Sequence, residues 1–146
     1  MNLPRYDYTT SDFKEYTFNS IGPKGSIKKV VRFQKIQNYP VIYNLAFGDL
    51  DQATGDINDS ITSDNKDRDI VLATVASTVI DFCDHYGDHF ILAMGSTPAR
   101  TRLYQIGINR LSKEISEGFD IYGLIGESMK RFETNVNYDA ILVKRK

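Results

Sequence analysis

The sequence is poor in residues that cross-link or bind metals. Among 146 residues it has one cysteine, Cys83, and two histidines. A lone cysteine cannot form an internal disulfide, which excludes a disulfide-stabilised scaffold. The sequence also has no run of about 18 apolar residues, so no membrane-spanning helix is expected. The formal net charge is only -1, so the charge of the whole chain gives no argument for a nucleic-acid or membrane partner.

The first 18 residues mix charged and aromatic side chains and lack the apolar centre of a secretion signal. A cytoplasmic location is therefore expected, without a membrane partner. Hydrophobic residues make up 41% of the chain, which is enough to form a core at this length. No repeat, low-complexity tract or flexible linker divides the chain. We therefore expect a single α+β domain over residues 1–146.

Hydrophobic periodicity predicts the element order βββαβαββ. The predicted strands cover residues 16–18, 27–36, 41–47, 90–94, 119–125 and 138–143, and the predicted helices cover about residues 64–86 and 98–118. Ser63 or Asp64 is suited to cap the first helix. Strands that bunch before and after the helices favour an α+β fold, in which a mainly antiparallel sheet of about five to six strands packs against two helices.

The segment from Gly95 to Tyr104 is the strongest candidate for a functional site. Its Gly-Ser-Thr-Pro turn leads from a predicted strand into a helix, with Thr97 suited to the cap and Pro98 to the first helical position. A helix start leaves backbone N–H groups without intrahelical partners, and the hydroxyls of Ser96 and Thr97 lie beside them in the sequence. This combination is typical of a site that binds an anion.

Two arginines, Arg100 and Arg102, follow in the first turns of the same helix. The helix dipole disfavours cations there, so a negative group is expected nearby. We predict a phosphate site, for a nucleotide or for nucleic acid, that is made by Ser96, Thr97, Arg100 and Arg102. The alternative is that one of the chain's own aspartates provides the anion. The next residue, Leu103, is expected in the core.

Charge is segregated along the chain. Residues 13–35 carry six cations against one glutamate, whereas residues 49–69 carry seven aspartates against two cations. The basic segment can form a stripe along which phosphates run, with nearby aromatic side chains stacking on bases. The candidate nucleic-acid-binding residues are Lys28, Lys29, Arg32 and Lys35. The alternatives are that the two segments neutralise each other, or that the basic strand protects a sheet edge from pairing.

The aspartates that follow residue 48 suggest a metal site, but they lack the acid and glycine spacing of a calcium-binding loop, and a solvated loop fits them better. Cys83, His85 and His89 lie close together. Gly87 breaks the helix between the two histidines, however, and no second ligand pair exists elsewhere. The glutamates late in the chain show no spacing typical of a general acid and base. No metal, cofactor or catalytic residue is therefore assigned, and enzymatic activity is not favoured.

Four stretches of the sequence carry a resemblance to a known family. They read YNLAFGD at 43–49, VLATVA at 71–76, GSTPARTRLY at 95–104 and NYDAILV at 137–143. Together they resemble an uncharacterised family of small cytosolic proteins from Bacteroidetes-type bacteria. The resemblance implies a free-standing bacterial domain and supplies no catalytic residue, so the emphasis on residues 95–104 rests on the physical argument above.

Three functions are consistent with these patterns. The favoured one is a non-enzymatic binding module whose anion site engages phosphate, in nucleic acid or in a nucleotide. The second is a protein-interaction module, such as a toxin–antitoxin or defence component or a homodimer. The third is a nucleotide-processing enzyme with a metal held by the aspartate loop, which requires Asp49, Asp51 or nearby acids to lie close to Arg100.

Overall fold

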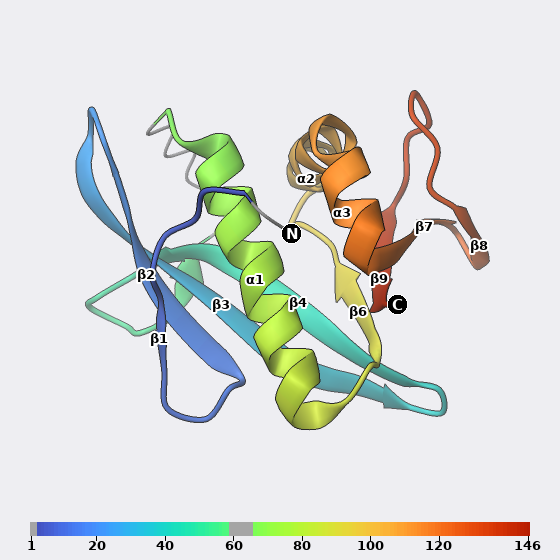
Figure 1. The fold of residues 1–146 in the computed structure, drawn as a ribbon, viewed down its shortest axis with the longest axis horizontal. Coiled ribbons are helices and arrows are strands. Elements are labelled where there is room, and N and C mark those ends of the chain that lie inside the picture. Colours follow the sequence, from blue (N-terminus) through green and yellow to red (C-terminus); the bar gives the residue numbers. More distant parts are fainter. Residues whose placement is uncertain (1–2, 59–65) are drawn as a thin grey trace.

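The computed structural model describes residues 3–58 and 66–146, in which nine strands form one mixed sheet and three helices lie on one of its faces (Figure 1). The strand order is β1-β2-β3-β4-β6-β9-β7-β8, with β5 paired to β4. The strands are β1 Thr9–Thr10, β2 Glu15–Gly22, β3 Gly25–Asn38, β4 Val41–Leu50, β5 Ile57–Asn58, β6 Phe90–Ala93, β7 Phe119–Ile125, β8 Ser128–Arg131 and β9 Ala140–Arg145. The helices are α1 Arg68–Tyr86, α2 Pro98–Arg110 and α3 Ser112–Gly118.

The predicted sheet of five to six strands with two helices is wrong. The additional strands β1, β5 and β8 are two to four residues long, too short to show a period-two pattern. The predicted second helix is two helices, because the backbone at Leu111 leaves helical geometry with φ -107° and ψ 18°. Leu111 and Ile115, on either side of this break, are both buried.

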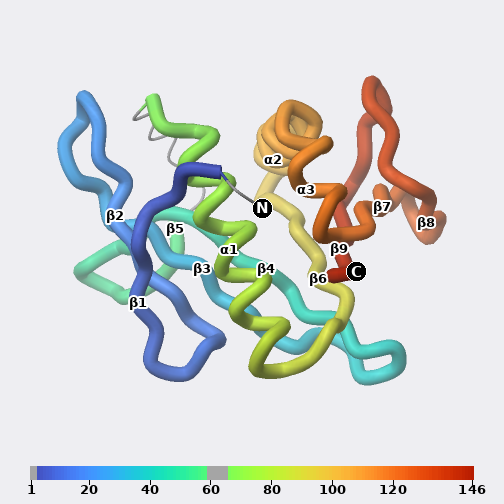
Figure 2. Tube along the Cα trace, in the orientation of Figure 1, coloured from blue at the N-terminus to red at the C-terminus, as the bar shows by residue number. Residues whose placement is uncertain are grey.

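One strand pair within the described sheet, β4 with β6, is parallel, whereas the others are antiparallel. Parallel neighbours need a long crossover connection. Helix α1 lies in that connection and packs across β3 and β4 (Figure 2). The mixed sheet thus follows from the position of α1 between β4 and β6 in the chain.

The first helix begins later than predicted. Its predicted caps, Ser63 and Asp64, lie outside the described residues. Helix α1 starts at Arg68, and Asp67 precedes it without capping it through its side chain. The Asp67 carboxylate instead accepts hydrogen bonds from the Tyr6 hydroxyl at 2.7 Å and the Ser20 hydroxyl at 2.5 Å. Tertiary hydrogen bonds therefore engage the Asp67 side chain, which capping preferences would otherwise assign to the N-terminus of α1.

The core lies between the sheet and the helices. Phe33 of β3 stacks on Phe82 of α1 with ring centroids 4.3 Å apart, and Tyr43 of β4 meets the same ring edge to face at 4.8 Å. Tyr16, Phe82 and Ile141 are almost completely buried. Strand side chains alternate between the two faces of a sheet. The face that carries Phe33 and Tyr16 is therefore the helix-covered face.

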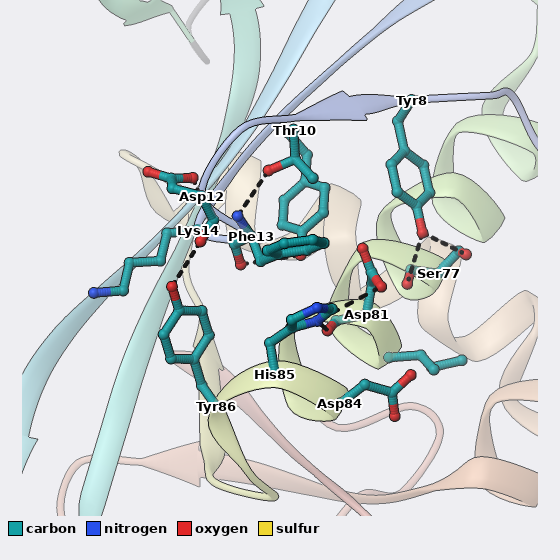
Figure 3. Close-up of polar contacts among 12 residues, drawn as sticks. Tyr8, Thr10, Asp12, Phe13, Lys14, Ser77, Asp81, Asp84, His85 and Tyr86 are labelled. Atoms are coloured by element: carbon teal, nitrogen blue, oxygen red, sulfur yellow. Dashed lines mark hydrogen bonds and ion pairs between the residues drawn. The ribbon is translucent and has the colours of Figure 1, made fainter.

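The segment before β2 runs along α1 and is fixed to it at several points (Figure 3). The Tyr8 hydroxyl lies 3.3 Å from the Ser77 hydroxyl, and the Tyr86 hydroxyl donates to the Asp12 carbonyl at 2.6 Å. Phe13 stacks on His85 with ring centroids 3.5 Å apart. These contacts hold α1 in place over the sheet, and α1 forms one wall of the cavity described below.

Candidate functional site

A cavity of about 330 Å³ lies between α1, α2 and the helix-covered face of β4. Most of its wall is apolar. Phe47 of β4, Leu72 and Val75 of α1, and Ile108 of α2 are among the residues that line it. The Tyr104 hydroxyl of α2 donates to the Phe47 carbonyl at 3.3 Å and ties the helix to the sheet beside the cavity. The volume falls within the range of about 300 to 1,000 Å³ that small-molecule pockets occupy.

The charged side chains of the wall are unevenly balanced. Among the described residues, four cations line the cavity, Lys29, Arg68, Arg100 and Arg110, against two carboxylates, Asp49 and Asp67. The Lys29 and Asp49 side chains form an ion pair and are only 8% and 17% exposed. Arg110 pairs with Asp69 at 2.5 Å, near the start of α1. The described wall is thus apolar in most places and positive in net charge.

Asp67 occupies a hydrogen-bonded position on the cavity wall. Besides the bonds from Tyr6 and Ser20, the Tyr6 backbone N–H donates to the Thr74 hydroxyl at 2.9 Å, which fixes the Tyr6 ring beside the carboxylate. Burial raises the pKa of the Tyr6 hydroxyl, and the bond to Asp67 raises it further. The Tyr6 phenol therefore remains a donor to Asp67 across the neutral pH range.

The start of α2 has the predicted cap. Thr97 precedes the helix, its hydroxyl accepts from the Arg100 N–H at 3.2 Å, and Pro98 is the first helical residue. The turn before it is closely packed, because the Gly95 N–H donates to the buried Thr101 hydroxyl at 3.0 Å. A Cβ atom on Gly95 would lie 2.7 Å from the Thr101 nitrogen. The N–H groups of Gly95 and Arg100 are therefore hydrogen-bonded within the protein. Both belong to the set of donors that the sequence predicts for a ligand.

The predicted anion-binding residues separate into two groups. Arg100 lines the cavity, whereas Ser96, Thr97 and Arg102 do not. The exposed Arg102 side chain donates to the Asn137 side-chain oxygen, away from the cavity. Leu103, expected in the core, is 46% exposed, so that expectation is wrong. The core-facing positions of α2 are instead Thr101, Gln105 and Ile108.

The predicted basic stripe is divided between the two faces of β3. Lys29 lies on the helix-covered face in its ion pair with Asp49, whereas Lys28 and Arg32 lie on the opposite face. Arg32 donates to the Glu15 carboxylate at 2.7 Å. Lys35 is exposed and shares the alternation of Lys29. The four candidates therefore do not form one surface, and nucleic-acid binding by them stays a prediction.

The aspartates meet the proposed geometric condition only in part. Asp49 lines the same cavity as Arg100, whereas Asp51 does not, and Asp59 lies outside the described residues. In residues 3–58 and 66–146, no group of three or more His, Cys, Asp or Glu side chains is arranged to hold a metal ion. Cys83 is buried, and burial raises the pKa of its thiol to about 11. Its thiolate is therefore scarce at neutral pH.

The alternative that residues 13–35 and 49–69 neutralise each other is supported by the Lys29–Asp49 pair, but sequence reasoning did not identify this pair or the role of Asp67. One signal could have identified the first. Lys29 falls in the alternation that places Val31 and Phe33 in the core, and a lysine on a buried face requires an ionic partner. The partner itself could not be predicted, because Lys29 meets Asp49 only once the register of β3 with β4 is known.

The fold and the cavity define a class of domain: one mixed sheet, covered by helices on one face, with a ligand-sized cavity between helices and sheet. The chain belongs to the family of unknown function DUF6934, which it matches over residues 2–146. No curated protein and no solved structure matches it. The resemblance to an uncharacterised family is thus confirmed, whereas the bacterial source and the cytoplasmic location stay predictions. None of the described helices is long and apolar enough to cross a membrane.

Proposed function

We propose that this chain is a binding module for a small molecule with an anionic group and an apolar part, held in the cavity between α1, α2 and β4. The observation that carries the proposal is the composition of the described part of the cavity wall, which is apolar in most places and includes four cations against two carboxylates. A nucleotide, which combines a phosphate with a flat base, is one ligand of this kind. An aliphatic carboxylate is another.

Arg100 is the cation best placed to select the anionic group. It lies on the first turns of α2, and its guanidinium can bind phosphate or carboxylate through two parallel hydrogen bonds. The apolar residues of α1 and β4 would then enclose the remainder of the ligand and exclude water from the bound anion.

The competing interpretation is that the cavity is only loosely packed core and that its cations serve internal ion pairs. The two interpretations differ in their expectation for Arg100 and Arg102. These arginines lie two positions apart on the same helix, but only Arg100 lines the cavity. Arg102 is therefore a matched control for the effect of removing one positive charge from α2.

The test is isothermal titration of inorganic phosphate, mononucleotides and decanoate into the wild type, Arg100→Ala and Arg102→Ala. The proposal expects at least one amphipathic anion to bind more tightly than inorganic phosphate. Arg100→Ala should weaken that binding by about tenfold, since a hydrogen-bonded ion contact contributes about 1.5 to 3 kcal/mol. Arg102→Ala should change it by less than about twofold. Absence of binding by all three ligand classes, or equal losses in both variants, would contradict the proposal.

A further inference from the structure

The face of the sheet opposite the helices carries an aromatic and basic surface that is separate from the cavity. No helix among the described residues covers this face (Figures 1 and 2). Leu142 of β9 lies on this face and is nevertheless only 3% exposed. Phe90 of β6 and Tyr122 of β7 lie on the two strands that flank β9, and their rings meet edge to face with centroids 6.2 Å apart. Tyr122 lies directly opposite Leu142 in the register of β7 with β9.

A cation lies over each of the two rings. Lys144 Nζ is 5.1 Å from the Phe90 ring centroid, and the Arg131 guanidinium is 4.9 Å from that of Tyr122. The Arg131 side chain is 68% exposed. The cations over both rings are thus carried by long, flexible side chains of the sheet itself. Such side chains can move aside when a flat partner stacks on the ring.

Lys28 and Arg32 of β3 lie on the same side of the sheet, because they alternate with the core-facing residues of that strand. We call Lys28, Arg32, Phe90, Tyr122, Arg131 and Lys144 the helix-free face. Two carboxylates accompany its four cations, and each pairs with an arginine: Glu15 with Arg32 and Asp120 with Arg131. These four cations and two carboxylates sum to a positive charge, although the whole chain has a net charge of -1.

We propose that the helix-free face binds single-stranded nucleic acid, with bases stacked on Phe90 and Tyr122 and phosphates held by Lys144, Arg131, Lys28 and Arg32. Aromatic side chains on an open sheet, interleaved with cations, match the chemistry of a strand whose bases are unpaired. This goes beyond the cavity and does not depend on it. A second copy of the chain is a poorer occupant, because an isologous contact would bring two positive surfaces together.

The test is fluorescence anisotropy with labelled single-stranded RNA and DNA decamers and a DNA duplex. The expected result is binding of single strands that is tighter than binding of the duplex, and that weakens by about tenfold or more between about 50 and 200 mM salt. Tyr122→Leu keeps an apolar side chain opposite Leu142 but removes the ring. It should weaken binding by about tenfold, because stacking on a base contributes strongly to such complexes.

Two matched controls separate this face from general effects. Tyr39→Leu alters a tyrosine that is 92% exposed outside the helix-free face. Lys35→Ala removes an exposed lysine of β3 on the opposite side from Lys28. Both should leave affinity within about twofold of the wild type, whereas Lys28→Ala should reduce both affinity and its salt dependence. Circular dichroism confirms that each variant is folded.

Three outcomes would overturn the proposal: no salt-sensitive binding by the wild type, equal losses in Tyr122→Leu and Tyr39→Leu, or a dimer in light scattering that Tyr122→Leu dissociates. Arg100→Ala should bind the decamers as the wild type does. Its failure to do so would place the nucleic acid at the cavity instead. If no ligand bound in the cavity, the prediction for the helix-free face would not change. The cavity proposal and the nucleic-acid proposal can therefore fail independently.

Discussion

Lys29 of β3 and Asp49 of β4 are directly opposite each other in the antiparallel register, and their side chains form an ion pair on the wall of the cavity. Both are largely removed from solvent. Removing one partner of such a pair leaves an uncompensated charge, which costs more than the pair contributes. Substitutions of Lys29 and Asp49 therefore test whether a buried ion pair stabilises the cavity wall.

Lys29→Met should lower the free energy of unfolding by about 2 to 4 kcal/mol, because the largely buried Asp49 carboxylate loses its ion pair with Lys29. The double variant Lys29→Met, Asp49→Leu should recover most of that loss. Urea unfolding of the wild type, both single variants and the double variant measures the coupling. Losses that simply add in the double variant would show that the two side chains do not interact.

Gly95→Ala should destabilise the protein by about 1 to 3 kcal/mol, because the added methyl group would overlap the backbone of Thr101 and the side chain of Arg100 at the start of α2. Gly118→Ala is the matched control, since an added methyl group there meets nothing within 4 Å. Thermal unfolding should show a lower Tm for Gly95→Ala and little change for Gly118→Ala. Similar midpoints for the two variants would mean that the turn before α2 is looser than described.

Thr97→Ala should cost about 1 kcal/mol, because the Arg100 N–H loses the hydroxyl that caps α2. Thr97→Ser keeps a hydroxyl at the same position and should restore most of the stability. Chemical unfolding of the three proteins measures the effect. If Thr97→Ala were as stable as the wild type but bound the cavity ligand more weakly, the hydroxyl would serve the ligand rather than the helix.

Stability should fall at alkaline pH because of Tyr16. Burial, with a smaller contribution from Asp81, raises the pKa of its hydroxyl above the ordinary value of 10.0. A raised pKa in the folded state means that the unfolded chain loses this proton first. The stabilisation is therefore complete below about pH 10 and is lost progressively as the pH rises above it.

Urea unfolding from pH 8 to 11 measures this dependence. Tyr16→Phe should flatten the alkaline decline, although it also removes the hydrogen bond to the Phe13 carbonyl at 3.0 Å and so lowers stability at neutral pH. Tyr39→Phe, at an exposed position, should leave the decline as steep as in the wild type. An identical decline in all three proteins would assign it to other groups.

Features set by local chemistry could be predicted from the sequence, whereas features set by tertiary packing could not. The Thr97 cap and Pro98 start of α2 follow from neighbouring residues alone, and the structure confirms both. The break at Leu111 carries no glycine or proline, so no local rule marks it. The short strand β8 exists only because β7 offers it an edge. The fold class was therefore wrong in the number of strands and helices.

The candidate site shows the same division. Arg100 was selected for its place in the first turns of a helix, and the structure places it on the cavity wall. Arg102 was selected for the same reason but contacts Asn137, a residue 35 positions later. Two arginines with the same local signal thus face different surroundings. The opposite wall of the cavity, formed by Phe47 and Leu72, depends on how α1 crosses β4 and could not be inferred from residues 95–104.

The central claim is that a ligand occupies the cavity, and Ala76→Leu tests it most directly. Ala76 of α1 lines the cavity, and a leucine there fills part of the space with apolar atoms while leaving every charged residue of the wall unchanged. Isothermal titration of the tightest-binding amphipathic anion into Ala76→Leu should show at least about a tenfold loss of affinity, with folded-state stability unchanged or higher. An affinity equal to that of the wild type in a stably folded Ala76→Leu protein would contradict the claim.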